Sequence, residues 1–431
     1  MFRPLLIPVS AFLLLWAVVF THYQTNFAGI APDRLFHNWQ LNGQARVLGG
    51  IVADVHGLDK QGSNMGRVYH EGTGPDDLEP GQKWTPTYEI FAEYPEGSDV
   101  VFDAYPTQYG LQQIAYSWVT RHFGLTSLGQ IQTVVAALSA AALAWLVLLY
   151  CRVYDPLLAA FFLLALGATP MFITMGRNLY WSPFLLLLPA IFSVYLYWAR
   201  GLALRIALLI AIAGAMFLKS ASNYEYITSV TMLACATFLV APFFEGARRP
   251  RLLMALAVWG ACVAGFIAAL LLHADMRGDT LVEGLQNIYI EDVARRTYGD
   301  SSSYQGETKQ SLDASTLDVL KMYLYEFYPG KRLMVLPGKV FLALIGLSLI
   351  GLLHKAARQH PHFRRDLAIL VVFFSIPASW FVLAKGHSFT QTHINFVLWY
   401  FGFIPALLYV SWSTVKSMFS DIALSISKGR R

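Results

Sequence analysis

The chain has 431 residues, of which 56% are hydrophobic and only 14% are charged, and its formal net charge is +5. Soluble domains carry about a quarter of charged residues, so this composition excludes an ordinary soluble globular protein. The apolar residues gather in runs that approach the length of about 20 residues needed to cross a hydrocarbon core. We therefore predict an all-α polytopic membrane protein. The three cysteines indicate neither a disulfide framework nor a zinc site.

Ten membrane-spanning helices are predicted along the chain. Their approximate ranges are 4–21, 131–150, 156–174, 180–199, 203–218, 227–243, 252–272, 336–353, 367–384 and 396–414. The first run, "LLIPVSAFLLLWAVVF", is longer than the apolar part of a usual signal peptide, and no A-x-A pattern follows it. We expect it to remain as an anchor, and we expect residues 1–431 to form a single membrane domain.

The basic residues indicate the orientation. Stretches such as "EGARRPR" and "HKAARQHPHFRRD" fall in short connections that all lie on one side when both termini are placed in the cytoplasm. Cytoplasmic connections carry an excess of Lys and Arg, so this orientation is favoured over its reverse. The long polar segments 22–130 and 273–335 then face outward. We expect the chemistry of the protein on the extracytoplasmic face of the membrane.

Two interfacial helices are predicted in the first outer loop. In "APDRLFHNWQLNGQARVLGG", apolar residues recur at three- or four-residue steps, and the stretch "FDAYPTQYGLQQIAYSWVTRHFGL" indicates a second such helix. Helices of this kind lie in the plane of the membrane surface and would wall a cavity there. Asp33 opens the first stretch, either as a helix cap or as a functional carboxylate. Asp54 and Asp59 are competing carboxylates in the same loop.

Cations recur in the outer turns. Charges beside apolar spans are costly unless they are paired or functional, although snorkelling to the interface is the alternative explanation. A ring of cations suits a phosphate or diphosphate headgroup. The phosphate-binding candidates are Arg177, Lys219, Arg296, Lys385 and His387. The candidates for contact with the rest of a substrate are Trp39, Tyr105, Tyr109, Tyr224, Glu225 and His393. The two histidines are spaced poorly for metal ligation on one helix face, and we predict no metal site.

The layout resembles that of the membrane glycosyltransferases of the GT-C fold, over nearly the whole chain. The segments "YPTQYGLQ", "RNLYW", "NYEY" and "HSFTQTHINFVLWY" are similar to segments of uncharacterised bacterial members of this kind. The resemblance implies inverting transfer of a sugar from a polyprenyl-phosphate donor to a glycan, lipid or protein acceptor. Asp33 would act as general base, and the cations above would stabilise the departing phosphate. Arg34 follows Asp33 where many members have a second acid, so participation of a divalent metal stays open.

The same resemblance implies a bacterial inner membrane, with membrane lipids as neighbours, a periplasmic active site and no nucleic-acid partner. The outer loops contain no N-x-[ST] sequon, which also disfavours a lumenal eukaryotic protein. Two other functions remain open. A ligase for lipid-linked glycans would transfer a whole polymer rather than one sugar. A lipid or solute transporter would show repeated halves and charged residues in the middle of its spans.

Overall fold

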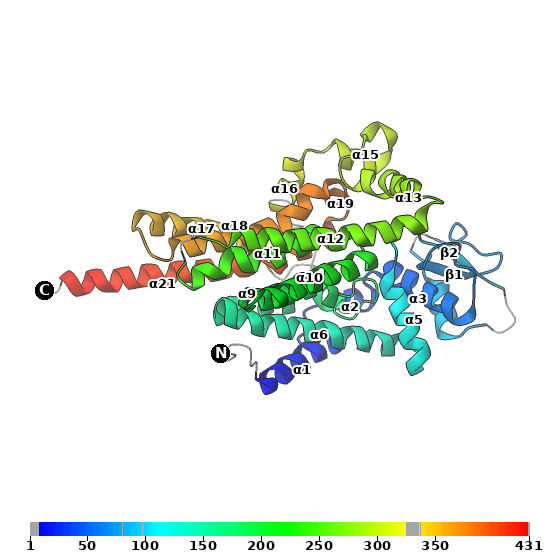
Figure 1. Ribbon diagram of the computed structural model, residues 1–431, viewed down its shortest axis with the longest axis horizontal. Coiled ribbons are helices and arrows are strands. Elements are labelled where there is room, and N and C mark those ends of the chain that lie inside the picture. Colours follow the sequence, from blue (N-terminus) through cyan, green and yellow to red (C-terminus); the bar gives the residue numbers. More distant parts are fainter. Residues whose placement is uncertain are drawn as a thin grey trace.

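The structure is a computed structural model that describes residues 8–79, 81–95, 99–247, 249–324, 336 and 338–429, with side chains up to residue 420. It is mostly helical, with 74% helix and 3% strand. Long helices run beside one another along the long axis of the molecule, and shorter elements gather at one end (Figure 1). The described part of the chain begins and ends toward the other end (Figure 1).

Within the described residues, six helices are long and apolar enough to cross a membrane. They are α6 (Leu128–Val153), α10 (Leu202–Ser222), α11 (Ile227–Phe244), α12 (Leu252–Arg277), α17 (Gly338–Ala357) and α18 (Phe363–Leu383). Lipid tails cannot form hydrogen bonds with a peptide backbone, whereas a helix forms these bonds within itself. Apolar helices of this length are therefore stable as membrane spans. A bent pair, Thr392–Phe401 with Phe403–Ser420, would make a seventh. The chain is therefore a multi-pass membrane protein by the length and composition of its helices.

The other predicted spans correspond to shorter or interrupted helices. Three apolar helices contain 17, 12 and 15 residues, namely α1 (Val9–Thr25), α7 (Pro156–Gly167) and α9 (Phe184–Trp198). The predicted span 156–174 is interrupted, because α7 ends at Gly167 and Pro170 starts a separate helix, α8 (Pro170–Met175). Thr169 between them is extended, as the residue before a proline usually is. The last predicted span bends by 42° where a 3₁₀ segment (Phe396–Phe401) meets α21 (Phe403–Gly429).

A close approach of α10 and α12 depends on a glycine. A Cβ added at Gly265 would clash with the backbone oxygen of Ala213, whereas a Cβ at Gly260 would meet nothing within 4 Å. We expect Gly265→Ala to destabilise the protein by about 1–3 kcal/mol, because the helices must move apart. Gly260→Ala, on the same helix, should not destabilise the protein and should raise its stability by up to about 1 kcal/mol, because alanine favours the helix. Thermal unfolding in detergent measures both variants, and equal melting temperatures would contradict the close packing.

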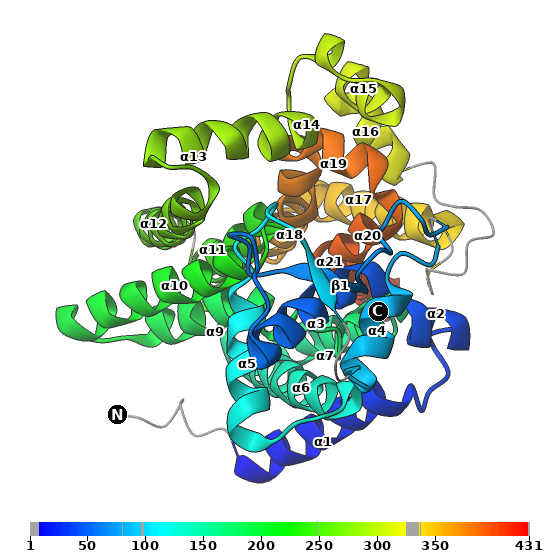
Figure 2. The same cartoon turned by 90° about the vertical axis from the view of Figure 1, so that its right-hand side faces the viewer.

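The first large loop forms a small layer at one end of the long helices (Figures 1 and 2). Its elements are α2 (Asp33–Asn38), α3 (Leu41–His56), β1 (Gly66–His70), α4 (Thr85–Ala92), β2 (Val100–Ala104) and α5 (Leu111–Phe123). The first predicted interfacial helix is divided into α2 and α3, because Gln40 adopts a left-handed conformation with φ of 54°. Its apolar side chains Phe36, Trp39, Val47 and Ile51 are nevertheless all buried.

The second predicted interfacial helix is α5, which buries its polar side and exposes its apolar side. Gln112, Gln113 and Ser117 are buried, whereas Trp118 is 54% and Phe123 is 67% exposed. An exposed apolar side suits contact with the membrane surface.

β1 and β2 form a two-stranded antiparallel sheet, which the periodicity analysis does not predict. Both strands lie between α3 and α5 in the sequence, with α4 between them. The sheet pairs Val68 with Phe102, and both side chains join a small core with Ile90.

The second large loop forms a helical arm beside α12 and α18 (Figure 2). The arm contains α13 (Leu281–Ile288), a π-helical turn (Tyr289–Val293), α14 (Ala294–Arg296), a 3₁₀ turn (Ser301–Ser303), α15 (Gly306–Asp313) and α16 (Thr316–Leu324). It meets α19 (Lys385–Thr390), and α20 (Thr392–Asn395) follows. Residues 325–335, the end of the predicted outer loop, lie outside the described residues.

Candidate functional site

A polar cavity of about 400 Å³ lies where the first loop, the short turns and the helical arm meet. Four residues selected from the sequence line it, namely Tyr105, Glu225, Arg296 and His387. They come from four segments that are far apart in the sequence. The cavity is also lined by residues that include Gln40, Asn42, Arg46, Tyr180, Trp181, Arg295, Thr308 and Gln391.

Glu225 is the acidic residue among those that line this cavity. It sits in the turn between α10 and α11 and is buried. Nε2 of Gln108 donates to both carboxylate oxygens at 3.2 Å, and the Tyr180 hydroxyl donates to Oε1 at 3.3 Å. Burial raises the pKa of Glu225, but the Arg296 guanidinium, followed by His387 and Lys219, more than offsets this and lowers the pKa below its ordinary value. The carboxylate is therefore ionised at neutral pH.

Arg296 supplies positive charge to the cavity from α14. Its guanidinium is 3.9 Å from Asp292, which Arg295 contacts more closely at 3.1 Å. Arg277 also lies 3.9 Å from Asp292 and forms an ion pair with Glu291, so three arginines share two carboxylates. The cluster keeps a surplus of positive charge. Arg296 and Glu225 line the same cavity, and the described residues provide no direct ion pair between them.

His387 lines the cavity from α19. The Nδ2 group of Asn395 lies 3.3 Å from Nδ1 of His387, and an amide nitrogen can only donate, so in this amide orientation Nδ1 accepts and the ring proton stays on Nε2. Burial, and next the charge of Arg296, lower the pKa of His387 to about 4. His387 is therefore neutral at pH 7 and can act as a hydrogen-bond donor through Nε2.

Asp33 and Arg177 lie away from this cavity. Asp33 is the first residue of α2 and is exposed, and no described residue forms a hydrogen bond or ion pair with its side chain. Arg177 donates to the backbone oxygen of Phe36 at 3.0 Å, and its guanidinium stacks 3.9 Å from the centre of the Phe36 ring. Arg177 therefore holds α2 in place.

Lys219 and Lys385 are both buried and bind backbone carbonyls. Nζ of Lys219 donates to the backbone oxygen of Asn223 at 2.7 Å and to its side-chain oxygen at 2.5 Å. The Asn223 amide in turn donates to the backbone of Tyr180 at 3.0 Å, so Lys219 orders the turn that carries Glu225. Lys385 donates to the carbonyls that end α15, at 2.6 Å each. Both ammonium groups act in this structure as helix-end donors.

The other substrate candidates do not line the cavity. Trp39 is buried, and its ring stacks on the Trp181 ring with ring centres 5.7 Å apart. Tyr109 is half-buried, and its backbone oxygen accepts from Asn64. Tyr224 shares a hydrogen bond of 2.9 Å with His273. His393 is half-buried on α20, close enough to affect the charge of His387.

Three further residues contribute to the site. Arg46 lies over the Tyr105 ring at 3.6 Å, Gln108 is fully buried against Glu225, and Tyr180 donates to that carboxylate. Burial first, and next the charge of Glu225, raise the pKa of Tyr180 well above its ordinary value, so Tyr180 remains a donor. Arg46 was visible as a cation on the polar side of an amphipathic helix. For Gln108, the sequence offered only its position in the polar turn "YPTQYG" as an indication of a role in the site.

An apolar groove of about 240 Å³ adjoins the cavity and also includes Arg296 in its lining. Its other walls include Tyr224, Phe266, Leu270 and Trp380. A second apolar pocket, of about 260 Å³, shares Phe266 and Leu383 with it and extends along α11 and α12. Arg296 therefore borders both a polar compartment and an apolar one.

Among the described residues, no group of three or more His, Cys, Asp or Glu side chains lies close enough together to hold a metal ion. Comparison of the chain with protein-family models, with curated proteins and with solved structures finds no match.

Proposed function

We propose that this protein transfers a sugar from a polyprenyl-phosphate donor to an acceptor at the membrane surface. The observation that carries the proposal is the position of Arg296, which lines both the polar cavity and the apolar groove. A lipid-linked phosphate matches the character of both compartments, because its headgroup is anionic and its tail is apolar. Arginine is well suited to phosphate because its planar group donates two parallel hydrogen bonds.

The cavity contains the groups that an inverting transfer requires. The Glu225 carboxylate removes the proton of the acceptor hydroxyl as its oxygen attacks the anomeric carbon. The bond from that carbon to the lipid phosphate breaks, and Arg296 and the Nε2–H of His387 stabilise the charge that develops on the phosphate. We assign the base to Glu225 rather than to Asp33, because Glu225 lines the cavity and Asp33 is exposed on α2.

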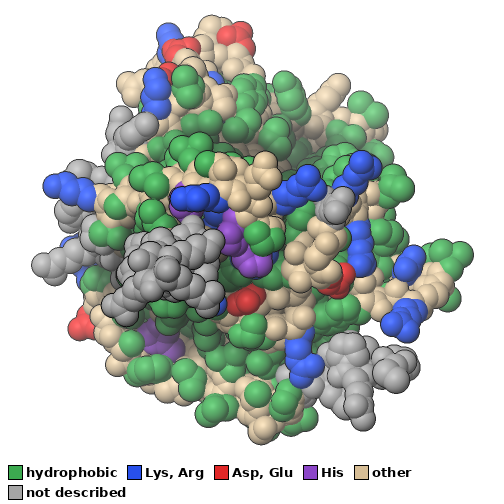
Figure 3. Space-filling model, turned by 90° about the vertical axis from the view of Figure 1, so that its left-hand side faces the viewer, with side chains coloured by type: hydrophobic (Ala, Val, Ile, Leu, Met, Phe, Trp, Pro, Cys, Tyr) green, Lys and Arg blue, Asp and Glu red, His purple; other side chains and the backbone are tan. Residues whose placement is uncertain are grey.

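The proposal includes ten crossings of a bacterial inner membrane, with both termini in the cytoplasm and the cavity in the periplasm. The end of the molecule opposite the first-loop layer supports this orientation, because Lys and Arg side chains are spread over it and acidic side chains are fewer (Figure 3). Cytoplasmic surfaces of membrane proteins carry such an excess. The short helices α1 and α9, and α7 together with α8, would provide the additional crossings.

The test is transfer of labelled sugar from polyprenyl-phosphate donors in membranes that contain the wild-type chain or Asp33→Asn at equal protein level. We expect both proteins to transfer single sugars at similar rates. Loss of transfer in Asp33→Asn alone would retain the reaction and move the base to Asp33. Transfer of a whole glycan would favour the ligase, and no transfer with any donor would overturn the proposal.

A further inference from the structure

A second polar pocket, of about 320 Å³, lies at the opposite end of α18 from the site described above. His362, just before α18, lines this pocket, whereas His387 of the first cavity follows the end of the helix. A helix of 21 residues spans about 30 Å, so the two pockets lie on opposite sides of a membrane. This pocket plays no part in the proposed transfer.

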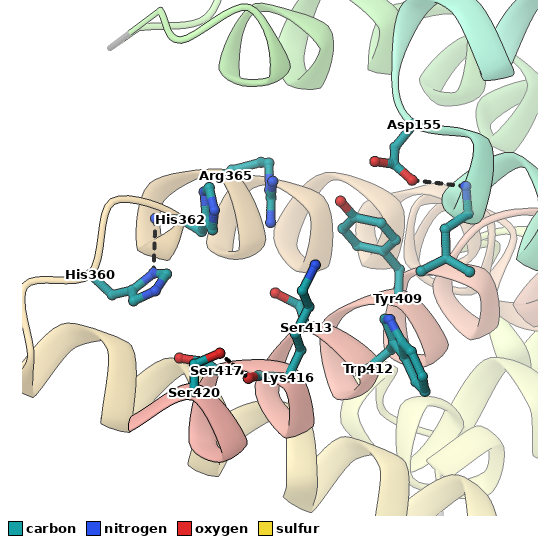
Figure 4. A pocket seen from close by; sticks show the side chains of 11 residues that line it. Asp155, His360, His362, Arg365, Tyr409, Trp412, Ser413, Lys416, Ser417 and Ser420 are labelled. Carbon is teal, nitrogen blue, oxygen red and sulfur yellow. Dashed lines mark hydrogen bonds between the residues drawn. The ribbon is translucent and has the colours of Figure 1, made fainter. Parts of the chain in front are cut away.

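Arg365 and Lys416 are the cations that line the pocket. Figure 4 shows Arg365 beside His360 and His362 on one side and the polar side chains of α21, including Lys416, on the other. The acidic residue of the lining, Asp155, is already engaged, because its carboxylate accepts a hydrogen bond of 2.8 Å from the backbone of Leu157 and caps α7.

A buried ion cluster behind the pocket also leaves positive charge in excess. Lys355 and Asp366 are fully buried, and Nζ of Lys355 contacts Oδ2 of Asp366 at 2.5 Å. Arg365 contacts the other oxygen of Asp366 at 3.0 Å through Nε. One carboxylate therefore serves two cations. The remaining guanidinium nitrogens of Arg365 form no hydrogen bond with the described residues, and Arg365 lines the pocket.

An unpartnered buried hydroxyl provides an independent observation. Ser417 is only 8% exposed and lines the pocket, and its Oγ forms no hydrogen bond with the described residues. A buried polar group without a partner costs stability, so such groups normally have one. Ser417 and the cations line the same space, which fits a ligand that both accepts hydrogen bonds and carries negative charge.

We propose that this pocket binds a phosphate group, carried by the headgroup of an anionic phospholipid. Arg365 and Lys416 pair with the phosphate oxygens, and Ser417 donates to one of them. The apolar part of the wall suits the glycerol end of a lipid, because it includes Leu157, Tyr409 and Trp412, of which Trp412 is 55% exposed. Basic pockets between membrane helices are a recurrent form of phospholipid site, and exposed Trp side chains favour the interface.

The experiment measures lipid binding to the purified full-length chain in detergent by native mass spectrometry. The probes are phosphatidylglycerol and, as a matched lipid without phosphate, diacylglycerol. Inorganic phosphate is titrated separately by calorimetry. The variants are Lys416→Gln, Ser417→Ala and the double variant Arg365→Gln with Lys416→Gln. The matched controls are Arg358→Gln and Arg364→Gln, which change exposed cations of the same region that do not line the pocket.

We expect the wild type and both controls to retain phosphatidylglycerol and not diacylglycerol. The double variant should bind phosphatidylglycerol about a hundredfold more weakly, about tenfold for each of the two charged contacts that it removes. The two single variants, which leave the Asp366 cluster intact, test the site if the double variant does not fold. Binding of inorganic phosphate alone, with the same dependence on the variants, would assign the site to a free phosphate. Equal lipid retention by all variants, or no binding of either probe, would overturn the proposal.

Discussion

Glu225→Gln is expected to lower the rate of sugar transfer by about 10²–10⁴-fold, the usual contribution of a positioned general base. Glutamine keeps the length of the side chain and an oxygen that can accept from Gln108 and Tyr180. Glutamine has no carboxylate that can act as a base, so no side chain accepts the proton of the acceptor hydroxyl. The rate should fall while the affinity for the donor changes little, because the donor phosphate is bound by Arg296.

The controls for this prediction are Asp33→Asn and Lys321→Gln. Both remove charges that are exposed and lie outside the cavity lining, and within the described part of the chain Lys321 forms an ion pair with Asp318 on its own helix. Both variants should transfer sugar at close to the wild-type rate. Melting temperatures of all three proteins separate loss of chemistry from loss of folding. A wild-type rate in a folded Glu225→Gln protein would remove Glu225 from the mechanism.

The sequence predicts the helical membrane character well, because long runs of apolar residues directly indicate which segments avoid water. Six of the ten predicted spans form helices long enough to cross, and a bent pair makes a seventh. The interruptions depend on local backbone chemistry. Pro170 breaks one predicted span, and a left-handed Gln40 divides the first interfacial helix. Non-glycine residues seldom adopt that conformation, so apolar periodicity alone could not indicate the division.

The candidate site was only partly visible in the sequence. The predicted topology places Glu225, Arg296 and His387 at the same level of the membrane, and this was the reason to group them. The structure brings these three residues to one cavity. Asp33 was selected for its nearness to the first span, but nearness along the chain gives no information about burial. Lys219 and Lys385 are engaged by backbone carbonyls, and every residue carries a carbonyl. These carbonyl partners therefore leave no mark in the sequence, although the side chain of Asn223, four residues after Lys219, is a further partner of that lysine.

Arg296→Gln is expected to lower sugar transfer and also to move the acidic limb of its pH profile upward. Burial raises the pKa of Glu225, and the Arg296 guanidinium is the leading cause that lowers it. Without that charge the pKa of Glu225 rises, so a higher pH is needed to keep the carboxylate ionised. The wild-type carboxylate stabilises the fold above its unfolded pKa, and this stabilisation is lost as the pH falls through the lower folded pKa. In the variant that loss begins at higher pH.

The adjacent arginine provides the matched comparison. Arg295 also lines the cavity, but its side chain is 43% exposed and pairs with Asp292 at 3.1 Å. It is not among the leading causes that lower the pKa of Glu225. Arg295→Gln should therefore leave the acidic limb close to its wild-type position, and Arg296→Lys should restore much of it by returning the charge. Rates measured between pH 4 and 9 with all three variants decide the matter. A limb that stays in place in Arg296→Gln would mean that Glu225 does not depend on Arg296 for its charge, and the electrostatic pairing on which the proposed chemistry rests would be wrong.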